Sequence, residues 1–143
     1  LTMLPILLFT DLDDTLFHSH RKIPPTQAHQ AMAYLADGSP ISYASPQQQT
    51  LLTHWQQSAT VIPVTARNYD SYRRVDIAFT HHAIINYGAV ILNPDGSVDA
   101  DWLEQSRQAA THSVPQLQAL ADQLTILPAT LLADLSIRLM WRI

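Results

Sequence analysis

Three short apolar runs stand out in the hydrophobic pattern of the amino-terminal part of the chain. Residues 3–10, 60–65 and 83–86 carry few polar side chains, which is typical of strands covered on both faces in a parallel sheet. Pro63 weakens the second run as a strand, because proline has no backbone N–H to donate to a ladder. The pattern therefore predicts three strands, of which 3–10 is the first.

Helices are predicted between these runs, where apolar residues recur at helical spacing. The first is expected over residues 26–36 and is ended by Asp37-Gly38. A second begins at Ser45-Pro46, because serine is a good cap and proline is favoured at the first helical position. A short third helix is expected over residues 68–75. The inner face of the second helix is predicted to consist of Leu51, Leu52 and Trp55.

The pattern changes after the third strand. Residues 89–92 and those that follow the turn at 93–96 are predicted to form a hairpin. Helical spacing begins at Asp101, with a break and a restart near residues 113–115. In residues 137–143 apolar side chains alternate with polar or long ones, which predicts a strand with one apolar face.

Strands that alternate with helices predict an α/β fold built on a doubly wound, Rossmann-like parallel sheet. Ligands in such sheets bind beyond the carboxyl ends of the strands. Those ends are expected at Thr10-Asp11, Val64-Thr65 and Ile85-Asn86. The fold therefore predicts a site where these polar residues gather.

Composition and charge exclude several classes of protein. Apolar residues make up 47% of the chain, which is enough for a core, and the absence of cysteine excludes a disulfide scaffold. The formal charge of −4 and the lack of a basic stripe argue against nucleic-acid binding. The apolar amino terminus is too short for a membrane helix and has no basic leader, so no membrane association and a cytoplasmic location are expected.

The acidic residues Asp11, Asp13 and Asp14 cluster directly after the first predicted strand. Carboxylates this close repel one another unless a cation or ligand neutralises them, and oxygen ligands suit Mg²⁺. An exposed acidic turn is the alternative for a bare pair of aspartates. The preceding strand favours a metal or ligand site, because it presents these side chains at the edge of the sheet.

Three segments resemble the haloacid dehalogenase (HAD) superfamily. LLFTDLDDTLF (7–17) is similar to its first motif, and VIPVTARN (61–68) is similar to its second, a strand that ends in Thr or Ser. AIINYGAVILNPDG (83–96) resembles the stretch before the cap in Cof-type sugar-phosphate phosphatases and in sucrose-phosphate and mannosyl-phosphoglycerate phosphatases. The resemblance covers roughly residues 3–100 and implies a HAD-like core over 1–100, with 101–143 as the beginning of an inserted α+β cap.

The resemblance also implies roles for particular residues in a Mg²⁺-dependent phosphatase. Asp11 would attack phosphorus and become a transient aspartyl phosphate, and Asp13 would act as the general acid and base. The Asp11 carboxylate and the Asp13 carbonyl would hold Mg²⁺. The substrate would be a small phosphorylated metabolite, with a sugar phosphate as the first expectation. The resemblance implies phosphoryl contacts from Thr65 and from the Asp14 backbone N–H. Arg67 follows Thr65 closely enough to reach a substrate anion, with a solvent-exposed arginine at a helix start as the alternative. Asn86 lies at a strand end and could line the pocket, with ordinary turn packing as the alternative.

The sequence departs from the family's pattern in its second half. Members also need a later lysine and an acidic Gly-Asp turn, but the one lysine here is Lys22, and Asp134 falls in the expected cap. The chain therefore looks like the amino-terminal half of a longer protein, and we expect it to be a weak or inactive catalyst by itself. It is further expected to self-associate through an open sheet edge, because the first strand would lack one neighbour.

Two other functions remain open. The chain could be a non-catalytic HAD-like remnant that acts as a binding or interaction module. A phospho-accepting receiver domain also clusters acids after its first strand, but it needs its phosphorylated aspartate on a later strand, where VIPVTARN ends in Thr65.

Overall fold

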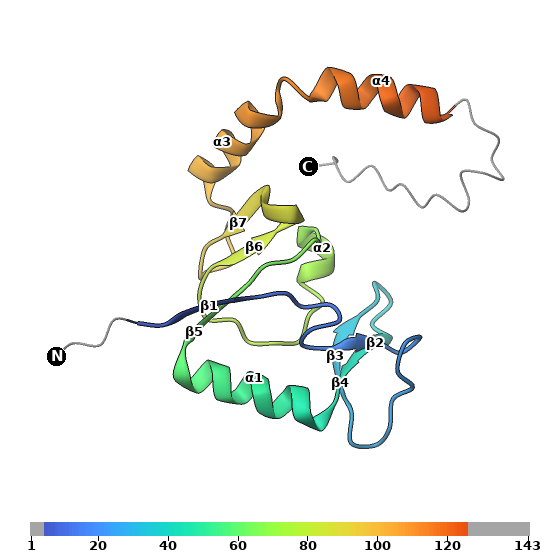
Figure 1. The fold of residues 1–143 in the computed structure, drawn as a ribbon, viewed down its shortest axis with the longest axis vertical. Coiled ribbons are helices and arrows are strands. Elements are labelled where there is room, and N and C mark those ends of the chain that lie inside the picture. The colour runs from blue at the N-terminus through green and yellow to red at the C-terminus, as the bar shows by residue number, and fades with distance from the viewer. Residues whose placement is uncertain (1–4, 126–143) are drawn as a thin grey trace. The chain divides into compact units, whose positions relative to one another are not determined.

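The computed structural model describes residues 5–125 (Figure 1). The chain divides into two compact units, Leu1–Asp99 and Ala100–Ile143. The first unit is mixed α/β, with a small parallel sheet and antiparallel sheets. Within the described residues, the second unit consists of two helices.

The parallel sheet pairs β1 (Leu7–Thr10) with β5 (Thr60–Pro63), so that Leu7 lies opposite Thr60. Strand β6 (Ala83–Ile85) pairs with β7 (Val90–Leu92) in an antiparallel sheet. A single parallel bridge between Val64 and Ile84 connects β5 to β6. Strands β1, β5 and β6 therefore run in the same direction, and the three strands predicted from the apolar runs are confirmed.

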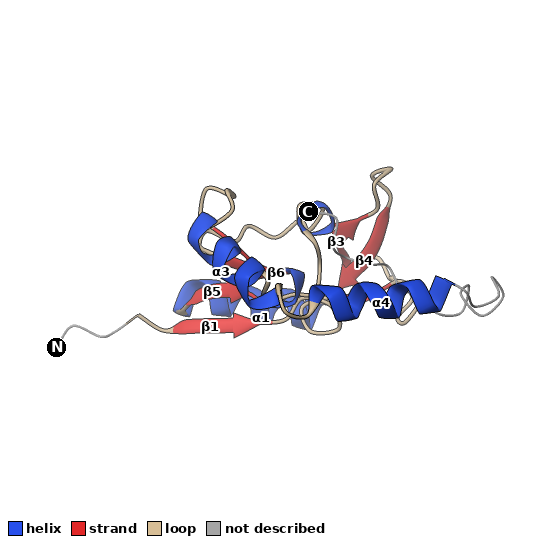
Figure 2. Cartoon of the chain, turned by 90° about the horizontal axis from the view of Figure 1, so that it is seen from above, coloured by secondary structure: helices blue, strands red, loops and turns tan. Residues whose placement is uncertain are grey.

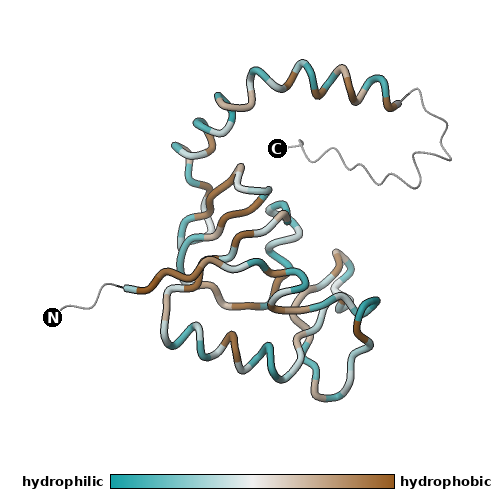
Figure 3. The backbone as a smooth tube through the Cα atoms, viewed as in Figure 1, coloured by the Kyte–Doolittle hydropathy of each residue, from teal (hydrophilic) through white to brown (hydrophobic). Residues whose placement is uncertain are grey.

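Cover on both faces was expected for the first strand, and this prediction is wrong. The side chains of Leu7 and Phe9 are 55% and 57% exposed, whereas Thr10 is buried. Figure 3 shows this strand as a brown, hydrophobic stretch of the tube. The apolar sequence indicates that both faces of the strand are suited to burial. It does not show which other segments would pack against them.

The helix predicted over residues 26–36 is absent, and a strand lies there instead. Strand β3 (Gln30–Tyr34) pairs with β4 (Pro40–Ala44) (Figure 2). Strand β4 also pairs with β2 (His18–Ser19), giving the antiparallel order β2-β4-β3. An irregular register around Met32 breaks the alternation of inward and outward residues, which hid the strand's period. Asp37-Gly38 is therefore a hairpin turn, with Gly38 at φ 83°, and not a helix stop.

The helix predicted after Ser45 is confirmed as α1 (Pro46–Ser58). The Ser45 side chain accepts a hydrogen bond from the Gln48 backbone, and the Gln48 side chain bonds the Ser45 backbone in return. Leu52 is buried in the core and Trp55 packs against it, but Leu51 is 41% exposed and does not belong to the inner face. The buried residues of this core are Leu12, Leu16, Phe17, Met32, Ala33, Ala44 and Leu52.

Two short helical elements follow the strands that carry the candidate site. Helix α2 (Tyr69–Tyr72) is shorter than the predicted 68–75 and is capped by Asn68. A 3₁₀ turn, η1 (Asn86–Gly88), follows β6 and leads into β7. The turn at 93–96 forms as expected, but beyond it only Val98 bridges back to Leu92, so β7 takes β6 as its partner strand.

The second unit contains α3 (Ala100–Ala110) and α4 (Val114–Thr125), which confirms both the helical pattern and the break between them. The predicted strand over 137–143 and Asp134 lie outside the described residues. No helix in residues 5–125 is both long and apolar enough to cross a membrane.

Candidate active site

The carboxyl ends of the parallel strands bring the predicted site residues to one edge. The Val64 N–H donates to the Thr10 carbonyl at 2.8 Å, which aligns the ends of β5 and β1. The Thr65 N–H donates to the Ile84 carbonyl at 2.9 Å, which aligns β5 with β6. Asp11, Thr65 and Asn86 therefore follow three adjacent strand ends.

Asp11 is exposed and has a fixed carboxylate orientation. Its Oδ1 accepts a hydrogen bond from the Leu12 N–H at 2.7 Å, and the Thr10 hydroxyl donates to the Asp11 carbonyl at 3.0 Å. This contact uses one lone pair of Oδ1 and leaves Oδ2 for a ligand. The arrangement suits a carboxylate that attacks or coordinates.

A tight turn after Asp11 separates buried from exposed side chains. The Leu12 carbonyl accepts hydrogen bonds from the Thr15 and Leu16 N–H groups at 3.3 and 2.9 Å. Leu12, Leu16 and Phe17 are buried, whereas the acids between them are exposed. Burial of these apolar residues therefore holds the carboxylates outward at the strand end.

Asp13 forms a bidentate ion pair with Arg67. The guanidinium Nε and Nη2 donate to the two carboxylate oxygens of Asp13, both at 2.8 Å. The Arg67 side chain is 16% exposed and that of Asp13 is 49% exposed. Both oxygens of the expected acid–base residue are thus occupied by a residue 54 positions away in sequence.

The polar groups of Asp14 are bonded within its own loop. Its backbone N–H, expected to contact a phosphoryl group, donates to the Phe17 carbonyl at 2.8 Å. Its carboxylate pairs with Lys22 and with His18, and hydrogen bonding to Lys22, followed by that to His18, holds the pKa of Asp14 below its usual value. The structure therefore gives Asp14 a bracing role in the loop at φ 61°.

Thr65 and Asn86 line the same edge. Thr65 is 4% exposed, and its hydroxyl oxygen accepts a hydrogen bond from the Arg67 N–H at 3.1 Å. A hydroxyl that accepts in this way can still donate its proton to a ligand oxygen. The Asn86 Oδ1 is buried and has no hydrogen-bond partner within the described protein atoms. A buried acceptor without a partner is costly, and the Thr65 hydroxyl is the donor that this pair offers to a ligand oxygen.

The backbone after Asn86 is held in an unusual conformation. Asn86 and Tyr87 have φ values of 51° and 54°, in the left-handed region that bulky residues rarely adopt. The Asn86 N–H donates to the Arg67 carbonyl at 2.8 Å, and the Tyr87 N–H donates to the Thr65 carbonyl at 3.2 Å. These two bonds fix the turn against the site residues of β5's carboxyl end.

The acidic residues provide a limited set of metal ligands. Residues 5–125 contain no group of three or more His, Asp or Glu side chains that could hold a metal ion. Mg²⁺ is commonly bound through one or two carboxylates, substrate phosphate oxygens and water. The free Asp11 oxygen and the Asp13 backbone carbonyl suit that mode, in which the substrate supplies part of the coordination shell.

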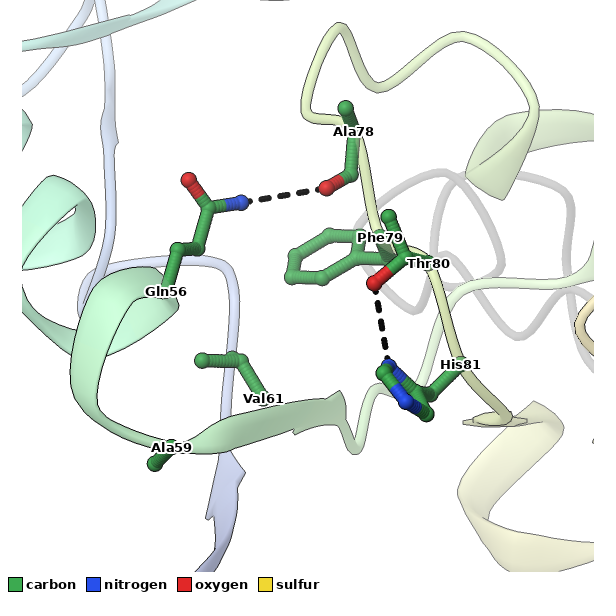
Figure 4. A pocket seen from close by; sticks show the side chains of 7 residues that line it. All are labelled: Gln56, Ala59, Val61, Ala78, Phe79, Thr80 and His81. Carbon is green, nitrogen blue, oxygen red and sulfur yellow. Dashed lines mark hydrogen bonds between the residues drawn. The ribbon is translucent and has the colours of Figure 1, made fainter.

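A separate pocket of about 280 Å³ lies away from these residues (Figure 4). It opens where β5 and β6 begin, whereas Asp11 and Thr65 follow the opposite ends of the strands. The Gln56 side chain spans it by donating to the Ala78 carbonyl at 3.1 Å. The lining residues are Gln56, Ala59, Val61, Ala78, Phe79, Thr80 and His81.

Sequence reasoning missed the residues that support Arg67. Its Nη1 donates to the Ser71 carbonyl at 3.2 Å, and its guanidinium lies 5.4 Å from the centre of the Phe17 ring. No spacing in the sequence indicates these contacts, because they join segments that only the fold brings together.

Comparison with protein-family models and with curated proteins finds no match to this chain.

Proposed function

We propose that the chain carries the amino-terminal part of a Mg²⁺-dependent phosphatase of the haloacid dehalogenase superfamily. One observation carries the proposal: parallel pairing of β1 with β5 brings Asp11 and Thr65 to adjacent strand ends. The substrate class is a small phosphorylated metabolite, with a sugar phosphate as the first expectation. In this proposal β1, β5 and β6 belong to a larger doubly wound sheet, and the unit from residue 100 begins a cap.

Asp11 is the proposed nucleophile. Its carboxylate oxygen forms a bond to phosphorus as the bond from phosphorus to the leaving oxygen breaks, and Asp13 donates a proton to that oxygen. Water then attacks the aspartyl phosphate, Asp13 takes a proton from the water, and inorganic phosphate leaves. Thr65 donates a hydrogen bond from its hydroxyl to a phosphoryl oxygen in both steps.

Charge neutralisation is the main requirement for this chemistry, because a carboxylate must approach a phosphate dianion. Mg²⁺, when bound by the Asp11 carboxylate and the Asp13 carbonyl, supplies part of that neutralisation. Arg67 is the cation of this edge that the chain itself provides. In the proposal, Arg67 and Thr65 orient the phosphoryl oxygens from the β5 side.

A second candidate is a phosphate-binding module without turnover. The occupied Asp13 carboxylate and the small set of metal ligands in residues 5–125 favour it. Such a module would use Thr65, Arg67 and Asn86 to bind an anion, with no need for a covalent step.

Single-turnover hydrolysis of an aryl phosphate separates the two candidates. A phosphatase predicts slow, Mg²⁺-dependent release of aryl alcohol that Asp11→Asn abolishes. The Asp70→Asn variant is the control, because Asp70 on α2 pairs with Arg74, beyond the end of that helix, and belongs to no part of the proposed site. Phosphate binding with no release above that of Asp11→Asn would favour the binding module.

A further inference from the structure

We propose that Asp13 and an incoming phosphoryl group compete for the Arg67 guanidinium, so that anion binding releases the Asp13 carboxylate. The inference rests on the proposed function in that it places the phosphoryl group at the edge formed by Asp11 and Thr65. It goes further by assigning the Asp13–Arg67 pair as the contact of the substrate-free chain, in which the substrate must displace Asp13.

Arg67 is held in place by contacts that do not involve Asp13. The Nη1 donates to Ser71, and the Phe17 ring lies beneath the guanidinium. The Arg67 backbone is bonded at both its N–H and its carbonyl, to the Thr65 hydroxyl and to the Asn86 N–H. The edge formed by Nε and Nη2 therefore keeps its orientation when Asp13 departs.

Asp13 is the more exposed partner of the pair. Its side chain is 49% exposed, against 16% for that of Arg67, and it lies on the turn that follows Asp11. The Asp13 carboxylate already borders solvent, so water can hydrate it when it leaves Arg67. Its exchange for a phosphate therefore leaves no buried charge without a partner.

The guanidinium edge suits a phosphate as well as a carboxylate. Two parallel N–H donors match two oxygens of either anion, and a phosphate dianion carries the larger charge. Thr65 lies two residues before Arg67, and its hydroxyl accepts a hydrogen bond from the Arg67 N–H, so both phosphoryl contacts come from one short segment after β5. Binding at this point pairs the phosphate with Arg67 and returns both Asp13 oxygens to solvent.

The exchange couples binding to proton transfer. While Arg67 holds both oxygens, Asp13 has no free oxygen aimed at a leaving group. Once the phosphoryl group occupies the guanidinium, the Asp13 carboxylate is free to take up a proton from solvent and to donate it to the leaving oxygen. The pair would thus keep the acid–base residue engaged until substrate is present.

The test is a double-mutant cycle on the full 143-residue chain, with inorganic phosphate as the probe and titration calorimetry as the readout. Asp13→Asn should tighten phosphate binding about fivefold to tenfold, because it removes the competitor for Arg67. In an Arg67→Gln background the same change should have less than a twofold effect. Coupling of this size between the two positions is expected only if Asp13 and the phosphate compete for the Arg67 guanidinium.

The neighbouring Asp14→Asn variant controls for general electrostatics. It removes an equal charge, but Asp14 pairs with Lys22 and not with Arg67, so its effect should be the same in both backgrounds. If Arg67→Gln fails to fold by circular dichroism, Arg67→Lys closes the cycle, since lysine keeps the charge without the two-donor edge.

Equal tightening by Asp13→Asn with and without Arg67 would overturn the exchange and leave the proposed function standing. Unchanged binding in Asp13→Asn, at measurable affinity for the unmodified chain, would overturn it as well. Failure of every variant to bind phosphate would overturn both the exchange and the phosphoryl site on which it rests.

Discussion

Replacement of Phe9 by lysine is expected to weaken self-association of the chain through β1. The Ile6 and Thr10 carbonyls accept hydrogen bonds from β5, so the backbone groups of Leu7 and Phe9 point to the opposite side. No other strand of residues 5–125 pairs with that side. Residues 1–10 carry no charge that would repel a second copy, and two copies related by a twofold axis present the same apolar surface.

The magnitude follows from the exposed area of Phe9. A phenylalanine side chain buries about 150–250 Å², and 57% of this one is exposed, so roughly 100 Å² is available in each copy. At about 25 cal/mol per Å², two copies contribute at most ~5 kcal/mol. Loss of about 3 kcal/mol of this maximum corresponds to a roughly 100-fold weaker dimer.

Sedimentation velocity over a range of concentrations measures this association. Leu51→Lys on α1 is the matched control, because Leu51 is also an exposed apolar residue, at 41%, but does not belong to the strand. A monomer at all concentrations for the unmodified chain would refute the reasoning. Association that Phe9→Lys leaves unchanged would show that another surface is responsible.

Three further predictions concern stability and ionisation. Ser45→Ala removes half of the reciprocal bond with Gln48 at the start of α1 and should lower the free energy of unfolding by about 1 kcal/mol in urea titrations. Burial raises the pKa of Tyr72 to about 12. Its stabilising contribution is complete below pH 10, the ordinary pKa of a phenol, and is lost as pH rises toward 12, so Tyr72→Phe should raise the midpoint of alkaline unfolding. Lys22→Met should raise the lowered pKa of Asp14, which a carboxylate NMR titration measures. The free energy of unfolding should then fall less as pH drops below 3.8, the ordinary pKa of the group. An unchanged pKa would refute the role of Lys22.

Local signals in the sequence predicted the elements whose ends are defined by strong capping or apolar runs. Ser45-Pro46 located the start of α1, and the run TVIPVT located β5 in spite of Pro63. The segment 26–36 failed because its apolar spacing matched a helix by coincidence, while the irregular register near Met32 concealed a strand. Asp37-Gly38 suits both a helix end and a hairpin turn, so pairing with β4 decided the outcome.

Only those residues of the candidate site that follow a strand end could be predicted from the sequence. Asp11, Thr65 and Asn86 could be grouped because parallel strands share an edge. The ion pairs of Asp13 with Arg67 and of Asp14 with Lys22 could not be predicted from the sequence. These contacts depend on how the turn and the loop after β1 fold back. Cover for β1 was equally beyond prediction, because an apolar strand does not specify its neighbours.

Beryllium fluoride binding tests the central claim most directly, because this phosphoryl mimic bonds to the carboxylate that would be phosphorylated. In ¹⁹F NMR spectra with Mg²⁺, the account predicts a bound resonance that disappears in Asp11→Asn and persists in Asp70→Asn. Removal of Mg²⁺ by a chelator should abolish the same resonance. A bound resonance that survives Asp11→Asn, or none in the unmodified chain, would contradict the assignment of Asp11 as nucleophile.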